Sequence, residues 1–269
     1  MKQKHFWLAG AMMLAVCAGL TSCGGDDDEE LIPTTKNEDP SGGETPTPDS
    51  EDPSDGETPT PDPEDPSGGE TPSSDSHAYV DLGLPDGTLW ATMNVGANSP
   101  EEYGDYFAWG ETAPKEKYAW STYKWCNGSG DKLTKYNTRS DYGIVDNLTE
   151  PLPEDDAAYV NWGANWRTPS FDQIKVLING CNWEWSTLGG VYGQKGTSKT
   201  NGKTIFFPAA GYIWSMTLNR AGEMGYYRSG TYCPSPSGAY GLGFAEGSVD
   251  LVANYRCCGW SVRPVLSAK

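Results

Sequence analysis

The chain has 269 residues and a formal net charge of −18, and its charges are distributed unevenly. One lysine and eighteen acids between residues 24 and 76 give that segment −17, whereas sixteen bases and nineteen acids leave residues 77–269 near neutral at −3. Because an acidic segment repels phosphate backbones and anionic headgroups, this pattern argues against binding to nucleic acid or to an anionic membrane surface.

The first 22 residues have the pattern of an export signal. Lys2 and Lys4 precede an uncharged, mostly apolar run of roughly 15 residues, shorter than the roughly 20 that span a bilayer. The tetrapeptide Leu20-Thr21-Ser22-Cys23 resembles the lipobox of bacterial lipoproteins, in which the cysteine is lipidated after cleavage. We predict a lipoprotein signal peptide over residues 1–22 and lipidation at Cys23, which would anchor the protein in outer-membrane lipid. An ordinary secretory signal is the alternative.

Residues 24–76 form a low-complexity segment. The thirteen-residue unit EDPSGGETPTPDS and two variants of it cover residues 38–76, and the segment has no aromatic residue and ten of the twenty prolines. Units without apolar side chains cannot bury a core, while prolines and like charges favour an extended chain. We therefore predict a disordered acidic tether over residues 23–76. Its acidic start resembles the export signal of Bacteroidetes lipoproteins, which predicts an outer membrane location facing the cell exterior.

Residues 77–269 have the composition of one folded domain, with thirty aromatic residues and many glycines. Residues 77–84 and 88–97 are rich in β-branched and aromatic side chains. They flank the turn Pro85-Asp86-Gly87, so they predict a β-hairpin. A third strand is predicted within residues 104–111.

Two helices are predicted in the middle of this domain. The clearer one begins after Ser170, which can cap it, and Gln173 completes a capping box before Asn179-Gly180 ends the pattern. Four apolar residues share one of its faces: Phe171, Ile174, Leu177 and Ile178. A weaker helix is predicted over residues 153–163, with acids in its first turn.

Further strands are predicted after the helices, over residues 203–213, 225–232, 239–247, 248–255 and 259–266. Short strands, two helices and long loops in this order predict an α+β domain.

Long ordered motifs in this domain resemble a known family. They are YVDLGLPDGTLWATMNVGANSPEEYGDYFAWGET, NWGANWRTPSFDQI, IFFPAAGY and GWSVRPV, between about residues 79 and 265. The resemblance is to the Fibrobacter succinogenes major paralogous (FISUMP) domain of exported Bacteroidetes proteins. It implies a C-type lectin-like fold in which the N- and C-terminal strands pair, and a surface module that binds a ligand.

The domain has few of the residues that common catalytic sites need. Its one histidine is His77, at the tether junction, which leaves no Ser-His-Asp, Cys-His or His-based metal arrangement inside the domain. We therefore expect no catalytic residues and no cofactor. Glycoside hydrolysis by paired carboxylates is the alternative. The acids in question are Glu101, Glu102 and Asp105, and Asp141 and Asp146.

Five cysteines remain in the domain, Cys126, Cys181, Cys233, Cys257 and Cys258, and an odd number leaves at least one thiol without a disulfide partner in the chain. Their spacing does not determine pairing. Packing is the expected role of Cys126 and Cys181, and adjacency disfavours a relaxed disulfide between Cys257 and Cys258. The motifs of sugar-binding C-type lectins and an EF-hand loop are absent from the sequence, so no dedicated metal site is predicted.

Five tryptophans of the family-like segments are expected in the core: Trp90, Trp109, Trp162, Trp166 and Trp260. The segment from residue 226 to 258 departs from the pattern typical of the family, which indicates either ordinary drift or diversification by a retroelement. Tyrosine and arginine dominate binding energy at interfaces. We therefore predict ligand contacts from Arg228, Tyr232, Tyr240, Asp250, Asn254 and Arg256.

Three functions remain open from the sequence. The first is a tethered lipoprotein that binds an external glycan or protein, for adhesion or capture. The second is a carbohydrate-active enzyme or an accessory protein of glycan capture. The third is a structural component of the cell surface.

Overall fold

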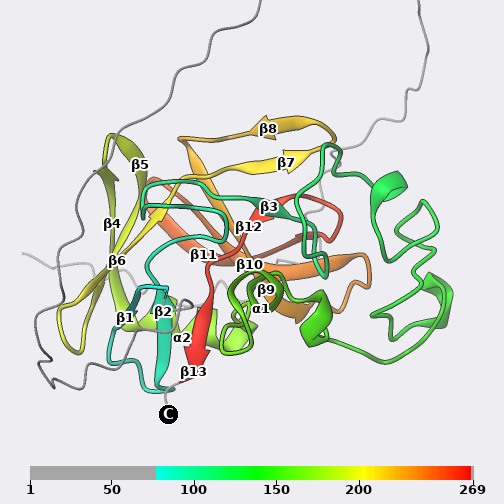
Figure 1. Ribbon diagram of the computed structural model, residues 1–269, viewed down its shortest axis with the longest axis horizontal. Helices are drawn as coiled ribbons and strands as arrows, with labels where there is room; N and C mark the ends of the chain where they lie inside the picture. The colour runs from blue at the N-terminus through cyan, green and yellow to red at the C-terminus, as the bar shows by residue number, and fades with distance from the viewer. Residues whose placement is uncertain (1–76, 268–269) are drawn as a thin grey trace, which may run out of the picture. The chain divides into compact units, whose positions relative to one another are not determined.

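The computed structural model describes residues 77–267, which form a mixed α+β fold consisting mostly of β-sheet (Figure 1). The predicted signal peptide, Cys23 and the tether lie outside these residues. The central sheet has five strands in the order β11-β10-β9-β12-β3. Its strands are β3 (Tyr106–Phe107), β9 (Met224–Tyr232), β10 (Gly238–Ala245), β11 (Ser248–Tyr255) and β12 (Trp260–Ser261).

A second sheet joins the two ends of the described chain, in the order β1-β2-β13. Its strands are β1 (Tyr79–Asp81), β2 (Thr88–Ala91) and β13 (Val265–Ser267). Strands β1 and β2 form the predicted antiparallel hairpin, and β13 pairs with the other side of β2. The expected pairing of N- and C-terminal strands is therefore confirmed.

The predicted capping signal produces helix α2 (Phe171–Gly180). The Ser170 hydroxyl accepts a hydrogen bond from the backbone N–H of Gln173, and the Gln173 side chain accepts one from the backbone N–H of Ser170. Its buried residues Ile174 and Leu177 join the largest core cluster, because α2 packs against β4, β9, β10 and β11. The prediction of this helix is confirmed.

The second predicted helix is shorter than expected. A 3-10 turn, η3 (Pro153–Asp155), comes first, and α1 (Ala157–Trp162) follows. Asp156 is extended and its carboxylate accepts a hydrogen bond from Ala158 N at 2.9 Å, so it caps the helix at this point. The predicted start at residue 153 is therefore wrong by four residues.

No strand is predicted between α2 and residue 203, but the structure has a long hairpin there. It consists of β4 (Cys181–Leu188) and β5 (Val191–Ser198), and β6 (Thr204–Pro208) completes a three-stranded sheet. Glycines lower the strand propensity of β5, yet they are needed. A Cβ on Gly193 would lie 2.2 Å from the carbonyl oxygen of Phe207 on β6.

A two-stranded hairpin, β7 (Tyr212–Trp214) and β8 (Thr217–Asn219), forms the upper edge of the domain in Figure 1. The β1-β2-β13 sheet lies at the lower edge of the same view. Residues between β3 and α1 form loops with two more 3-10 turns, η1 (Trp120–Thr122) and η2 (Ser140–Tyr142). The β7–β8 hairpin and the sheet formed by the first and last described strands therefore lie on opposite sides of the domain.

A buried arginine connects three segments of this core. Arg263 is 1% exposed, and its guanidinium donates to Asn94 Oδ1 at 2.8 Å and to the backbone oxygens of Phe206 and Ala91 at 3.0 and 3.3 Å. The same group lies 4.5 Å from the ring centroid of Phe207. Strands β2 and β6 are thus joined through one side chain.

We expect Arg263→Met to lower the free energy of unfolding by about 1–3 kcal/mol, because the acceptors around the guanidinium lose their donor while the apolar stem is largely retained. Urea unfolding measures the change. Arg220→Met is the matched control, since Arg220 forms an exposed pair with Glu223 and should change stability by less than about 1 kcal/mol. Equal effects of the two substitutions would contradict the prediction.

Candidate functional site

Both arginines of the predicted contact surface are buried. Arg228 is 2% exposed and Arg256 is 0% exposed. Their guanidinium carbons lie 4.3 Å from the ring centroid of Trp260 and 4.7 Å from that of Trp109, respectively. The expectation that these two side chains contact a ligand at the surface is therefore wrong, because stacking and backbone hydrogen bonds hold them inside.

The other four predicted residues do not form one surface. Tyr232 and Asn254 both pair with Ala239, from opposite sides of β10, whereas Tyr240 follows Ala239 and so lies on the other face of the sheet. Tyr240 is half-buried and packs against Phe171 of α2, with ring centroids 4.6 Å apart. Asp250 is exposed on the edge strand β11.

The tryptophans divide into two groups. The five expected in the core are all buried, which confirms that prediction. The remaining five of the described domain are half-buried: Trp120, Trp125, Trp183, Trp185 and Trp214. Half-buried tryptophans have an apolar face near solvent, so a binding surface is best sought among them.

Three half-buried aromatic residues from distant segments form what we call the aromatic cluster: Trp120 of η1, Trp214 of β7 and Tyr255 at the end of β11. Tyr255 lies between the other two, with ring centroids 5.7 Å from Trp120 and 6.0 Å from Trp214. This cluster was not predicted from the sequence. The aromatic run KYAWSTYKW, residues 117–125, contains one of its members, Trp120. Loop position alone does not reveal which of those rings reaches the surface.

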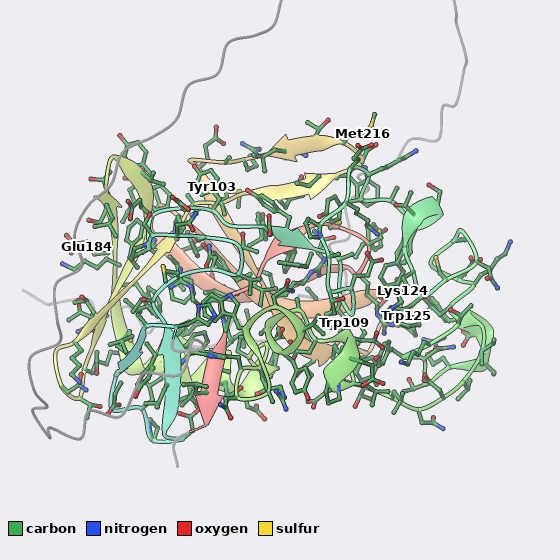
Figure 2. All side chains as sticks on the ribbon, in the orientation of Figure 1. Tyr103, Trp109, Lys124, Trp125, Glu184 and Met216 are labelled. Carbon is green, nitrogen blue, oxygen red and sulfur yellow. The ribbon has the colours of Figure 1, made fainter. Side chains whose placement is uncertain are left out.

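The tip of the β7–β8 hairpin carries two exposed apolar side chains next to Trp214 in the chain; Leu218, which pairs with Ile213, lies on the hairpin face opposite Trp214. Met216 is 74% exposed and Leu218 is 44% exposed, and Figure 2 shows Met216 at the upper edge of the domain. The tip is held by Tyr118, whose backbone N–H and oxygen bond Ser215 at 2.7 and 2.9 Å. Ser215 has a positive φ of 55°, which a non-glycine residue rarely adopts. The hairpin tip is thus fixed by backbone contacts on both sides.

The buried arginines lie beneath the aromatic cluster and hold its backbone. Arg228 Nη2 donates to three carbonyl oxygens of one turn, those of Tyr255 at 3.0 Å, Arg256 at 3.3 Å and Cys258 at 2.5 Å. Arg256 in turn donates to Gly238 O at 3.1 Å and Tyr136 O at 2.8 Å. Both arginines therefore position Tyr255 from inside.

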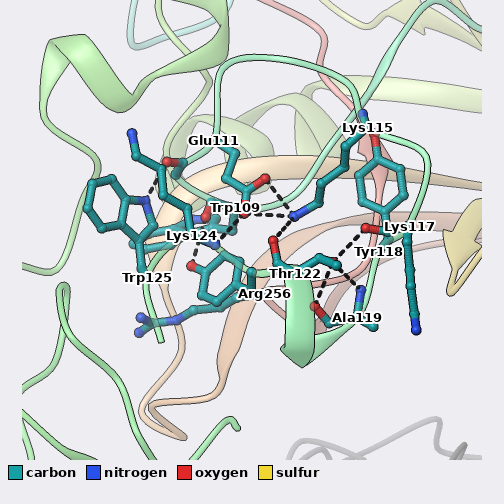
Figure 3. A network of polar contacts seen from close by, with 12 residues as sticks. Trp109, Glu111, Lys115, Lys117, Tyr118, Ala119, Thr122, Lys124, Trp125 and Arg256 are labelled. Carbon is teal, nitrogen blue, oxygen red and sulfur yellow. Dashed lines mark hydrogen bonds and ion pairs between the residues drawn. The ribbon is translucent and has the colours of Figure 1, made fainter. Parts of the chain in front are cut away.

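A network of polar contacts around Glu111, Lys115 and Thr122 holds η1, the 3-10 turn that carries Trp120 (Figure 3). The buried carboxylate of Glu111 pairs with Lys115 Nζ at 2.7 Å and accepts the backbone N–H of Lys124 at 2.8 Å. Lys115 also donates to the carbonyl oxygen of Thr122, the last residue of η1, at 2.9 Å. These bonds hold the end of η1 and the residue that follows Tyr123, so η1 presents Trp120 in a defined position.

Close packing restricts Trp120 further. A Cβ on Gly130 would lie 2.8 Å from the Trp120 ring, so only glycine allows the loop to approach this closely. The thiol of Cys126 donates to Trp120 O at 3.2 Å. The ring is therefore held by its neighbours as well as by its own backbone.

Two of the acids considered for glycoside hydrolysis, Glu102 and Asp146, accept hydrogen bonds from backbone N–H groups. Glu102 accepts the backbone N–H of Asn98 at 2.8 Å, and Asp146 accepts those of Tyr136 and Asn137 at 2.7 and 2.9 Å. Cys181 is buried in the main core, as expected, and burial raises the pKa of its thiol to about 11. Within residues 77–267, no group of three or more His, Cys, Asp or Glu side chains is placed to hold a metal ion. The same part of the chain has no helix long and apolar enough to cross a membrane.

A second buried acid braces the loops next to the cluster. Asp155 accepts hydrogen bonds from Lys135 Nζ and Tyr136 Oη, each at 2.7 Å, and from Lys124 Nζ at 3.2 Å. Burial by itself would raise the pKa of this carboxyl, but the three hydrogen bonds outweigh burial and hold the pKa below its usual 3.8. The ionised form is therefore the one that stabilises the fold.

This lowered pKa predicts a specific response to acid. A carboxyl with a lower pKa in the folded state contributes stability above about pH 4, which is lost as the pH falls through the folded-state value. Asp155→Asn should therefore be less stable than the unchanged protein at neutral pH, and this difference should shrink as the pH falls to about 2. Urea unfolding between pH 7 and about pH 2 measures the stability difference and its change with pH, and Asp250→Asn, at an exposed position, is the control. A difference that is independent of pH would contradict the assignment.

Comparison with known proteins gives no match to a protein-family model, to a curated protein or to a solved structure. The resemblance to the FISUMP domain stays a prediction.

Proposed function

We propose that this chain is a surface-tethered lipoprotein whose domain binds an external glycan or protein through the aromatic cluster. One observation carries the proposal: Trp120, Trp214 and Tyr255 come from three separate segments and meet at the edge of a core cluster, where all three stay partly exposed. Partly exposed apolar groups gathered in this way mark interaction sites in soluble domains. Tryptophan and tyrosine supply large, rigid contact areas for the apolar face of a sugar ring or of a protein side chain.

The support beneath the aromatic cluster favours binding over a purely structural role. Arg228 and Glu111 are buried and Lys115 is partly buried, and Arg228 and the Glu111–Lys115 pair fix the backbone at Tyr255 and at η1. Aromatic side chains held this way lose little further freedom when a ligand arrives, so less of the contact energy is offset. Preorganisation of this kind is expected of a recognition surface.

The position of the aromatic cluster agrees with presentation from a tether. The β7–β8 hairpin lies across the domain from β1, the first strand after the predicted tether (Figure 1). A ligand at the hairpin would therefore meet the face away from the attachment point. Lipid anchoring through Cys23 in the outer membrane, with the domain exposed to the cell exterior, is part of the proposal and rests on the sequence pattern of residues 1–30.

A C-type lectin-like fold is the second part of the proposal. It is supported by the pairing of the first and last described strands with β2, and by the long loops between β3 and α1. In this interpretation the long loops and the β7–β8 hairpin together form the binding face. The lectin-like assignment also accounts for the family-like motifs that surround the core tryptophans.

Screening the chain without residues 1–23 against arrays of glycans and of extracellular proteins tests the proposal. We expect Trp120→Ala and Trp214→Ala each to weaken binding of the captured ligand at least about tenfold, because each removes a large contact area. Trp185→Ala is the matched control, since Trp185 is also half-buried but stacks on Tyr192 in the β4–β5 hairpin. Loss of binding in the control alone, or unchanged binding in both cluster variants, would contradict the proposed site.

A further inference from the structure

Strand β11 forms one edge of the central sheet and is paired on one side only, with β10. The ladder between the two strands runs without a register shift from the pair of Ala245 and Ser248 to the pair of Gly238 and Tyr255. At the opposite edge of the same sheet, β3 has only two residues. The central sheet therefore has one long and regular edge, at β11.

The turn between β10 and β11 determines which backbone groups of β11 point away from β10. A two-residue loop joins the strands, so Ala245 and Ser248 form the first hydrogen-bonded pair. Hydrogen-bonded and non-hydrogen-bonded pairs alternate along an antiparallel ladder, so every second residue turns its N–H and C=O outward. These outward residues are Val249, Leu251 and Ala253. Within residues 77–267 their outward backbone groups have no hydrogen-bond partner.

The edge is open along the outward residues. Helix α2 contacts β9, β10 and β11 alike, so it covers a face of the sheet and not its edge. All three outward residues are partly exposed. The chain closes its own edge only at Tyr255, whose N–H donates to the side-chain oxygen of Asn254 at 2.7 Å. Residues 249–253 are therefore accessible to a further strand.

Strand β11 has none of the features that protect sheet edges from pairing with another chain. Natural edge strands are protected by lysines, by prolines or by a bulge. The sequence SVDLVANY has neither lysine nor proline, its single charged residue is Asp250, and its ladder with β10 has no bulge. An edge of this kind favours the addition of a strand.

A second copy of this chain fits the edge better than the predicted tether does. Residues 24–76 contain ten prolines, which lack the N–H that a ladder needs, and their charge of −17 is repelled by Asp250. Residues 77–269 are near neutral at −3, so two domains approach each other with little repulsion. When two β11 strands pair antiparallel around Leu251, each Asp250 lies opposite Val252 of the second copy. Like charges therefore do not lie directly opposite each other.

We propose that β11 is a homodimer interface, at which two copies of this chain pair antiparallel around Leu251 and join their central sheets. In this register Val249 pairs with Ala253 and Leu251 pairs with its own copy, so every outward N–H meets a C=O. The two Tyr255 positions would lie roughly 27 Å apart along the shared ladder, so the dimer would present two aromatic clusters. This inference goes beyond the proposed function and does not depend on what the clusters bind.

Amide exchange, followed by NMR on the chain without residues 1–23, tests the pairing residue by residue. We expect the three outward amides to exchange at least about tenfold more slowly at about 1 mM protein than at about 10 µM, because only the dimer bonds them. The amides of Asp250 and Val252 bond to β10, so their exchange should not depend on concentration. Sedimentation equilibrium over the same range should show the change from monomer to dimer.

Ala253→Pro blocks the edge without removing a hydrogen bond inside the monomer. The Ala253 N–H points outward, and proline is accepted at such positions of edge strands. We expect the dimer Kd to rise at least about tenfold, because each copy loses a donor and the ring fills the edge. Thr187→Pro is the matched control, since Thr187 has the corresponding outward position on β4, an edge strand of equal length. The control should leave the dimer Kd unchanged.

Four results would overturn the proposal. They are a monomer at every concentration, a dimer in which the outward amides stay unprotected, protection that does not depend on concentration, and loss of the dimer in Thr187→Pro alone. Concentration-independent protection would indicate an occupant from the same chain, such as the tether. If Ala253→Pro fails to fold, the exchange pattern of the unchanged protein still decides. Ligand binding by the aromatic cluster is measured separately, so either proposal can fail while the other holds.

Discussion

Within the described domain, arginine guanidinium groups that are buried without a carboxylate partner are the constraint on which much of the structure depends. Arg228, Arg256 and Arg263 each stack on an aromatic ring and donate mainly to backbone carbonyl oxygens. Carbonyl groups in loops and strand ends need donors when they are buried. One guanidinium can satisfy several of them, so each arginine fixes the path of segments that no sheet ladder connects.

This constraint connects the interior of the domain to its proposed binding surface. Arg228 fixes the turn after β11, and Tyr255 at that turn lies between Trp120 and Trp214. On the other side, the pair of Glu111 and Lys115 fixes η1. The cluster is thus a rigid surface whose geometry is set by buried charges, and binding there and stability of the core are expected to be coupled.

Local signals in the sequence predicted the elements that depend on neighbouring residues. The turn Pro85-Asp86-Gly87 between two apolar runs predicted the β1–β2 hairpin, and Ser170 with Gln173 predicted the start of α2. The β4–β5 hairpin was missed because glycines within β5 weaken the strand pattern. Those glycines are required by a contact with β6, such as that of Gly193 with the Phe207 carbonyl, which lies far away in the sequence.

The sequence by itself determined the α+β class, the β1–β2 hairpin, the core position of five tryptophans and the concentration of charge in residues 24–76. The pairing of the N- and C-terminal strands of the domain was implied by the family resemblance. Only the tertiary structure decided which polar and aromatic residues reach the surface. Arginine is mostly exposed in folded proteins, so residue type alone predicts Arg228 and Arg256 at the surface. Both are buried because carbonyl groups and aromatic rings from distant segments surround them. The aromatic cluster likewise joins residues 135 and 41 positions apart in the chain, Trp120 with Tyr255 and Trp214 with Tyr255, and such contacts leave no periodic signal in the sequence.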